Sequence, residues 1–189
     1  MSAPGSVTLQ EGSSYVGLTG SEGNDRLTGN AGDNILVGGA GDDLLLGLGG
    51  ADRLVTGAGV DSLYGGDGND TLLVTQKTTV RDLLSGGAGT DTLWVQDGQD
   101  LSLATLSDLE VLRGNGTVML SPAQVASLQA LNGVSVMLTG TASTFSLGIL
   151  TLSNGAKLLM PQFDPLLTST STGVLGSRGD DVISGGPDG

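Results

Sequence analysis

The nine residues Gly38-Gly39-Ala40-Gly41-Asp42-Asp43-Leu44-Leu45-Leu46 form a unit that the chain repeats. Three positions of this unit, a glycine, an acidic or amide residue and a leucine, recur every nine residues over six units. The residues at these positions are Gly23, Gly32, Gly41, Gly50, Gly59 and Gly68; Asp25, Asn34, Asp43, Asp52, Asp61 and Asp70; and Leu27, Leu36, Leu45, Leu54, Leu63 and Leu72. A fixed period with a leucine in phase indicates a stacked repeat architecture rather than a flexible glycine-rich linker.

Each unit consists of a turn followed by a short strand. The glycines allow the backbone to turn at positive φ without a Cβ clash, and the aspartate places a carboxylate inside that turn. The last three residues, with an aliphatic side chain in the middle, form a strand. One unit is too short for a complete solenoid coil, so we expect two consecutive units to make one coil.

This arrangement stacks polar residues of successive coils on both edges. Asp25, Asp43 and Asp61 stack on one edge, and Asn34, Asp52 and Asp70 stack on the other. Neighbouring strands lie about 4.8 Å apart, so the carboxylates repel each other unless a cation lies between them. The chain has no histidine or cysteine, which leaves oxygen ligands alone. Such ligands favour Ca²⁺ over zinc, copper or iron, and over Mg²⁺, which resists dehydration and demands tight octahedral geometry.

The unit resembles the Gly-Gly-x-Gly-x-Asp-x-aliphatic-x nonapeptide of the RTX (repeats-in-toxin) family over residues 20–73, 86–94 and 176–184. The resemblance implies an all-β fold, namely a right-handed parallel β-roll or β-solenoid with several Ca²⁺ ions in its turns. Position by position, it implies side-chain ligands at Asp25, Asn34, Asp43, Asp52, Asp61, Asp70, Asp91 and Asp181. It also implies carbonyl ligands in the turns around Gly20, Gly23, Gly38, Gly41, Gly65, Gly68, Gly86 and Gly89.

The repeat departs from this pattern in four places. Asn34 replaces an aspartate, so its site loses one charge. Thr56 replaces a leading glycine, and Leu48 lies where a second glycine is usual. The last interval between stacked aspartates is longer than two units, so three extra residues must loop out near Lys77 or Arg81.

The chain divides into four segments on this evidence. We expect a lead-in or cap strand over residues 1–19 and a calcium-binding RTX β-roll over 20–94. Residues 95–175 lose the glycine–aspartate turns and are expected to form longer, metal-free solenoid coils. A further RTX array begins at 176–189 and breaks off inside a turn, so we expect the chain to be a piece of a longer protein.

One short helix is expected within the metal-free coils, over residues 122–131. Ser121 is a suitable N-cap, and Pro122 suits the first helical position. The residues expected to share its apolar face are Val125, Leu128 and Leu131. Asn132-Gly133 is a stop signal, so the helix is expected to end there.

Composition excludes several functions. The net charge of −13 comes from 20 acidic and seven basic residues, and we interpret the acids as calcium ligands. About six Ca²⁺ ions would nearly cancel that charge if each stacked pair of turns held one. No Lys/Arg cluster is present for nucleic acid, no stretch approaches the roughly 20 apolar residues that span a membrane, and no His or Cys is available to activate a nucleophile. We therefore expect neither an enzyme nor a partner of nucleic acid.

These observations predict a calcium-dependent folding and structural module. The RTX resemblance implies that the parent is a type I-secreted bacterial protein, and we expect it to be of the surface-layer or adhesin kind. The chain would be disordered without calcium and would fold outside the cell, in the extracellular medium or on the bacterial surface. Copies of a surface-layer protein would associate into a lattice. The alternative is a C-terminal RTX accessory module of a secreted protease, lipase or epimerase, or of an RTX toxin.

Overall fold

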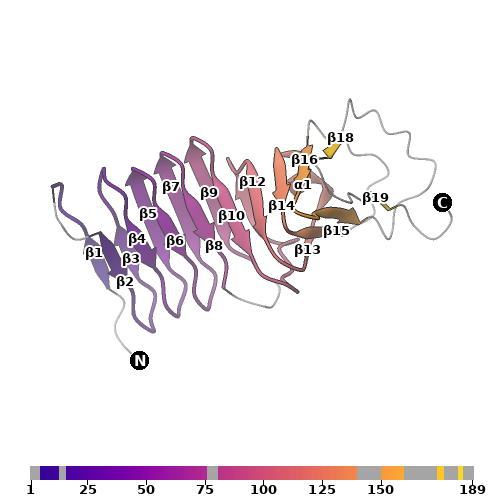
Figure 1. The fold of residues 1–189 in the computed structure, drawn as a ribbon. Coiled ribbons are helices and arrows are strands. Elements are labelled where there is room, and N and C mark those ends of the chain that lie inside the picture. The colour runs from indigo at the N-terminus through magenta and orange to yellow at the C-terminus, as the bar shows by residue number, and fades with distance from the viewer. Residues whose placement is uncertain are drawn as a thin grey trace. The chain divides into compact units, whose positions relative to one another are not determined.

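The computed structural model describes residues 5–12, 16–75, 81–139, 150–159, 174–176 and 183–184. In this part of the chain the regular structure is parallel β-solenoid with a single short helix (Figure 1). The chain divides into two compact units. The first comprises Met1–Gln76, Val80–Trp94 and Leu103–Leu109, and the second comprises Lys77–Thr79, Val95–Ser102 and Glu110–Gly189.

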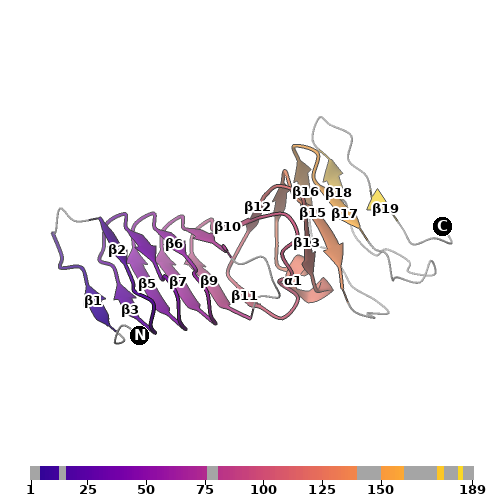
Figure 2. The same cartoon turned by 90° about the horizontal axis from the view of Figure 1, so that it is seen from below.

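The first unit stacks two parallel sheets, one on each side of the coil. One sheet has the order β1 (Ser6–Thr8), β3 (Arg26–Thr28), β5 (Leu44–Gly49), β7 (Ser62–Asp67), β9 (Leu83–Ala88) and β11 (Thr105–Ser107). The other side is formed, in order, by β2 (Gly17–Thr19), β4 (Ile35–Val37), β6 (Arg53–Val55), β8 (Thr71–Leu73) and β10 (Thr92–Val95). Seen from below, β3, β5, β7 and β9 form successive rungs (Figure 2).

The register confirms the predicted coil of two nonapeptides. Leu27 pairs with Leu45 and Leu45 with Leu63, so one coil takes two repeat units. The next partner of Leu63 is Leu84, which lies three positions beyond that spacing, and the other sheet shows the same change. The three extra residues therefore lie between β8 and β9, as the sequence predicts. Residues 76–80, which include Lys77, lie outside the described part of the chain.

The repeated leucine in each of the strands β3 to β10 forms the core. The leucines at this position are between 0% and 1% exposed: Leu27, Leu36, Leu45, Leu54, Leu63, Leu72, Leu84 and Leu93. Full burial of one such side chain contributes about 1.5–3 kcal/mol. Because few aromatic side chains are present, this stack of leucines replaces an ordinary globular core. The described residues before Thr19 join the same stack, since Ser6 pairs with Arg26 and Gly17 with Ile35.

The second unit also consists of parallel coils, but without the nine-residue period. Val111 pairs with Ala130 and Ala130 with Thr151, so successive coils here differ in length. One side is formed in order by β12 (Val111–Gly114), β14 (Ala130–Asn132), β16 (Leu150–Ser153) and β18 (Val174–Gly176). The other is the sheet of β13 (Thr117–Leu120), β15 (Ser135–Leu138), β17 (Lys157–Leu159) and β19 (Ile183–Ser184).

The expected helix exists but is shorter than predicted. Helix α1 spans Pro122–Ala126, and Ser121 caps it with a capping box that includes Gln124. The predicted extension to residue 131 is wrong, because Leu131 lies in β14 and pairs with Leu112. A helix as short as the predicted one is marginal by itself, and the parallel ladder buries Leu131 completely.

Replacing Leu54 by alanine should lower the free energy of unfolding by about 2–5 kcal/mol, because the change leaves a cavity in the leucine stack. Leu48→Ala is the matched control, since Leu48 is 49% exposed and its truncation should change stability by less than about 0.5 kcal/mol. Urea unfolding followed by circular dichroism, in the same buffer, measures both. Equal losses in the two variants would contradict the assignment of the core.

Candidate metal sites

Two rows of polar side chains follow the corners of the coils in the first unit. The first row comprises the residues directly before β3, β5, β7 and β9: Asp25, Asp43, Asp61 and Asp82. The second row comprises those directly before β4, β6, β8 and β10: Asn34, Asp52, Asp70 and Asp91. All eight are between 0% and 7% exposed. The stacking of residues two units apart on each edge is the arrangement that the sequence predicts.

Each row is held by hydrogen bonds between neighbouring coils. The backbone N–H of Asp43 donates to Oδ1 of Asp61 (2.9 Å), and that of Asp61 donates to Oδ1 of Asp82 (2.9 Å). In the second row the N–H of Asp52 donates to Oδ1 of Asp70 (2.7 Å), which in turn donates its own N–H to Asp91 (2.7 Å). One carboxylate oxygen of each pair is therefore satisfied by the coil before it.

The second carboxylate oxygen, Oδ2, does not receive such a hydrogen bond in every residue of the two rows. Oδ2 is buried and accepts no hydrogen bond, within the described part of the chain, in Asp43, Asp52, Asp70 and Asp82. A buried ionised oxygen without a partner is costly, because it has lost its hydration and gained nothing in return. A cation beside each oxygen removes that cost.

Oxygen atoms of two neighbouring coils approach each other beside the leading glycines Gly47 and Gly65. An ideal Cβ at Gly47 would collide with Oδ2 of Asp52 and with the carbonyl oxygen of Gly65 in the next coil. At Gly65 it would collide with Oδ2 of Asp70 and the carbonyl oxygen of Gly86. A carboxylate oxygen and a peptide oxygen thus converge on one space that only glycine leaves open, and hard oxygen donors of this kind fit Ca²⁺.

The predicted carbonyl ligands divide by their position in the turn. Those of the leading glycines, such as Gly38 opposite Gly20, face the space just described. The fourth-position glycines Gly41, Gly68 and Gly89 have positive φ, and a Cβ on any of them would strike the backbone of the preceding coil. These glycines are required by the turn itself. No group of three His, Cys, Asp or Glu side chains that could hold a metal occurs in the described residues, so backbone oxygens must supply much of any ligand set.

Sequence reasoning missed Asp82, which continues the first row after Asp61. The signal was the nine-residue period counted backwards from Asp91, which places an aspartate at 82 and a leucine at 84. The three extra residues hid this unit, because they interrupt the turn before it. The predicted ligand Asp181 lies outside the described residues.

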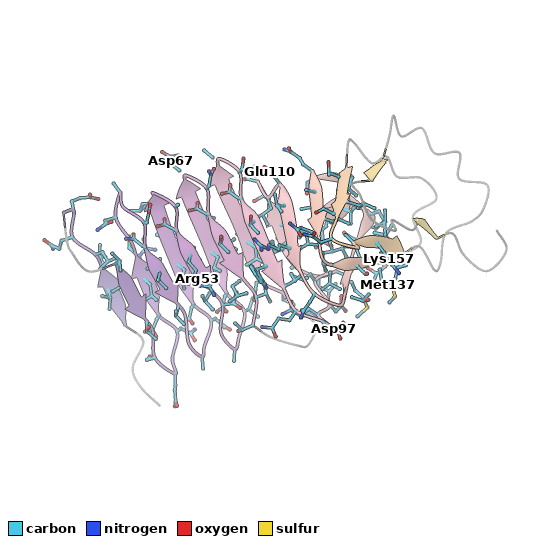
Figure 3. The ribbon with its side chains drawn as sticks, in the orientation of Figure 1. Arg53, Asp67, Asp97, Glu110, Met137 and Lys157 are labelled. Carbon is cyan, nitrogen blue, oxygen red and sulfur yellow. The ribbon has the colours of Figure 1, made fainter. Side chains whose placement is uncertain are left out.

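Two of the noted departures have visible consequences. Asn34 lies in the second row, where its Oδ1 accepts the N–H of Asn30 (2.7 Å) and its Nδ2 donates to Oδ1 of Asn30 (3.2 Å). Leu48 adopts a φ of 83°, in the left-handed region that costs a residue with a Cβ about 1–2 kcal/mol. Asp67 shows that an acid in the same turns can also face solvent, since it lies exposed at the end of β7 (Figure 3).

Burial changes the acidity of the two rows. It raises the pKa of Asp52 and of Asp82 to about 6, and it also raises the pKa of Asp43, Asp61 and Asp70. The pKa of Asp25 is lowered instead, because the backbone N–H and the hydroxyl of Ser21 donate to its carboxylate. Without a cation, most of the carboxyl groups in the two rows therefore resist ionisation.

The family model of the RTX calcium-binding nonapeptide repeat matches the chain in four copies, over residues 18–45, 46–74, 81–101 and 174–188. The first three copies contain both rows, including Asp82. Neither the curated proteins nor the solved structures gave a match. RTX repeats bind calcium and occur in secreted bacterial proteins, and their β-solenoid is a structural module rather than a catalytic fold. Across the described residues, every helix is too short to cross a membrane.

Without calcium, the folded state should be less unfavourable at about pH 5 than at about pH 7.5, so that more of the disordered chain folds at the lower pH. Folding raises the pKa of five carboxyl groups above the unfolded value of about 3.9. The resulting stabilisation is complete below that value and is lost as the pH rises through about 6. Circular dichroism in EGTA at the two pH values measures this stabilisation as the strength of the β-sheet signal. With calcium the trend should reverse, because protons and cation compete for the same oxygens. A β-sheet signal in EGTA that is equal or stronger at the higher pH would contradict the prediction.

Proposed function

Because the chain carries RTX calcium-binding nonapeptide repeats, we propose that it is a module of a secreted bacterial protein that folds only when calcium is bound. The side-chain ligands in this proposal are Asp43, Asp52, Asp70, Asp82 and Asp91, joined by carbonyl oxygens of the leading turn glycines. The observation that carries the proposal is the set of buried Oδ2 atoms, those of Asp43, Asp52, Asp70 and Asp82, that accept no hydrogen bond.

The mechanism is linkage between binding and folding. Without the cation, ionised carboxylates one coil apart repel each other, and ordering the glycine-rich turns costs conformational entropy. An acidic, glycine-rich chain of this kind remains disordered. Calcium binds only the stacked coils, because no other state brings a carboxylate and the next coil's carbonyl together. The free energy of binding thereby becomes free energy of folding.

The ligand set also suggests where folding takes place. Each site offers few carboxylates, so we expect dissociation constants on the order of 10⁻⁴–10⁻³ M, as in extracellular modules. Such sites stay empty at cytosolic calcium concentrations and fill outside the cell. The chain would therefore be exported unfolded and fold after export.

We further propose that the parent protein is a surface-layer or adhesin-type protein. Support comes from the presence of two solenoid units in one chain with few aromatic residues. That architecture suits a scaffold built by repetition, since each coil contacts only its neighbours.

Calcium should convert the chain from a disordered to a β-rich state. Far-UV circular dichroism in EGTA should show little regular structure, and addition of about 5 mM Ca²⁺, well above the expected dissociation constants, should produce a β-sheet spectrum. Mg²⁺ at the same concentration is the control and should have little effect, because it demands octahedral geometry and keeps its waters. Identical spectra in EGTA and calcium would refute the proposed function.

The surface-layer proposal predicts calcium-dependent self-association of the chain. Light scattering coupled to size-exclusion chromatography should give the monomer mass in EGTA and a larger, concentration-dependent mass in calcium. A folded chain that remains monomeric in calcium at high concentration would favour the accessory-module alternative.

A further inference from the structure

The turns of the first unit fall into two classes. In a closed turn, the backbone N–H of the second turn residue donates to the side-chain oxygen of the sixth. The closed turns are 20–25 (Ser21 to Asp25, 2.5 Å), 29–34 (Asn30 to Asn34, 2.7 Å) and 56–61 (Gly57 to Asp61, 2.9 Å). In an open turn the sixth residue keeps an Oδ2 that accepts no hydrogen bond, and the open turns are 38–43, 47–52 and 65–70.

The sequence explains which turns close. Each closed turn has a hydrogen-bonding side chain at its first or second position, namely Ser21, Asn30 or Thr56. The open turns have Gly-Gly or Gly-Leu there. The hydroxyl of Ser21 donates to Oδ2 of its turn's aspartate (2.9 Å), and the side chain of Asn30 accepts from its turn's asparagine (3.2 Å). In these two turns a polar side chain of the turn itself pairs with the sixth residue, as a cation would pair with the sixth residue of an open turn.

Thr56 closes its turn in a different way. It stands at the position of the leading glycines Gly47 and Gly65, where a Cβ would meet the carboxylate oxygen of its own turn and a peptide oxygen of the next coil, and it is 2% exposed. Its Oγ1 accepts the N–H of Thr75 (3.1 Å), and its carbonyl oxygen accepts the hydroxyl of Thr75 (3.2 Å). Both polar groups of Thr56 are thereby engaged by protein.

We propose that the closed turns take no calcium, and that Thr56 makes the turn 56–61 a metal-independent rung inside the calcium-binding stack. The first row is then interrupted at Asp61, whereas the second row binds calcium without interruption from Asp52 onwards. Asp25, Asn34 and Asp61, which the repeat pattern predicts as ligands, stabilise their turns through hydrogen bonds instead. This inference rests on the proposed function.

The number of calcium ions bound per chain tests the inference. Equilibrium dialysis against saturating Ca²⁺, with metal analysis by mass spectrometry, should show that Thr56→Gly binds at least one more ion than the wild type. Thr56→Ser is the control and should bind the wild-type number. The reciprocal change Gly65→Thr should bind at least one ion fewer. An unchanged number in a folded Thr56→Gly variant would overturn the inference.

A second pair of variants tests the inference if Thr56→Gly does not fold. Asp61→Asn should retain the wild-type number of ions, whereas Asp70→Asn, at the same position of an open turn, should lose one. Loss of an ion in both variants would overturn the inference. A wild-type chain that binds no calcium would instead refute the proposed function, so the two failures are distinguishable.

Discussion

The first unit depends on one constraint, which is that a carboxylate, or the amide of Asn34 in one turn, is buried at each described corner of the coil. The N–H of the preceding coil satisfies one oxygen, as between Asp43 and Asp61, and this bond fixes the spacing and the parallel direction of the stack. The other oxygen must find its own partner, because the site excludes water and burial penalises the charge. In a closed turn this partner is a donor of the turn itself. In an open turn with a leading glycine, the proposed partner is calcium.

The same constraint explains why the stack tolerates three extra residues. Between β8 and β9 the repeat distance grows by the same amount in both rows, so Asp61 meets Asp82 just as Asp70 meets Asp91. An insertion between the two rows lengthens one coil without shifting either row against its neighbour. Lengthening a loop by three residues costs little entropy, whereas breaking the row would leave another buried oxygen without a donor.

The sequence predicted the features that are strictly periodic. These include the coil of two nonapeptides, the two rows and the leucine stack, because all follow from the spacing of residue types. Asp82 was missed because an insertion breaks the period before it. The helix was predicted too long because the ladder of β12 and β14 takes Leu131, which local propensity does not show. Whether a turn is closed or open follows from the side chains at its first two positions, Ser21, Asn30 and Thr56, which the repeat pattern treats as variable or as departures.

The second unit shows that parallel coils do not require acidic corners. There, amide side chains make the hydrogen bonds. Gln99 accepts the N–H of Gln96 (2.7 Å), and Gln124 donates to the carbonyl of Leu101 (2.7 Å). The side chain of Asn154 donates to the side chain of Asn132. Neutral groups satisfy such positions at any calcium concentration. A solenoid that places carboxylates where amides suffice loses stability in the absence of the cation and regains it on binding. Under the proposed function the acidic rows make folding conditional on calcium, which suits a chain that is exported unfolded and folds outside the cell.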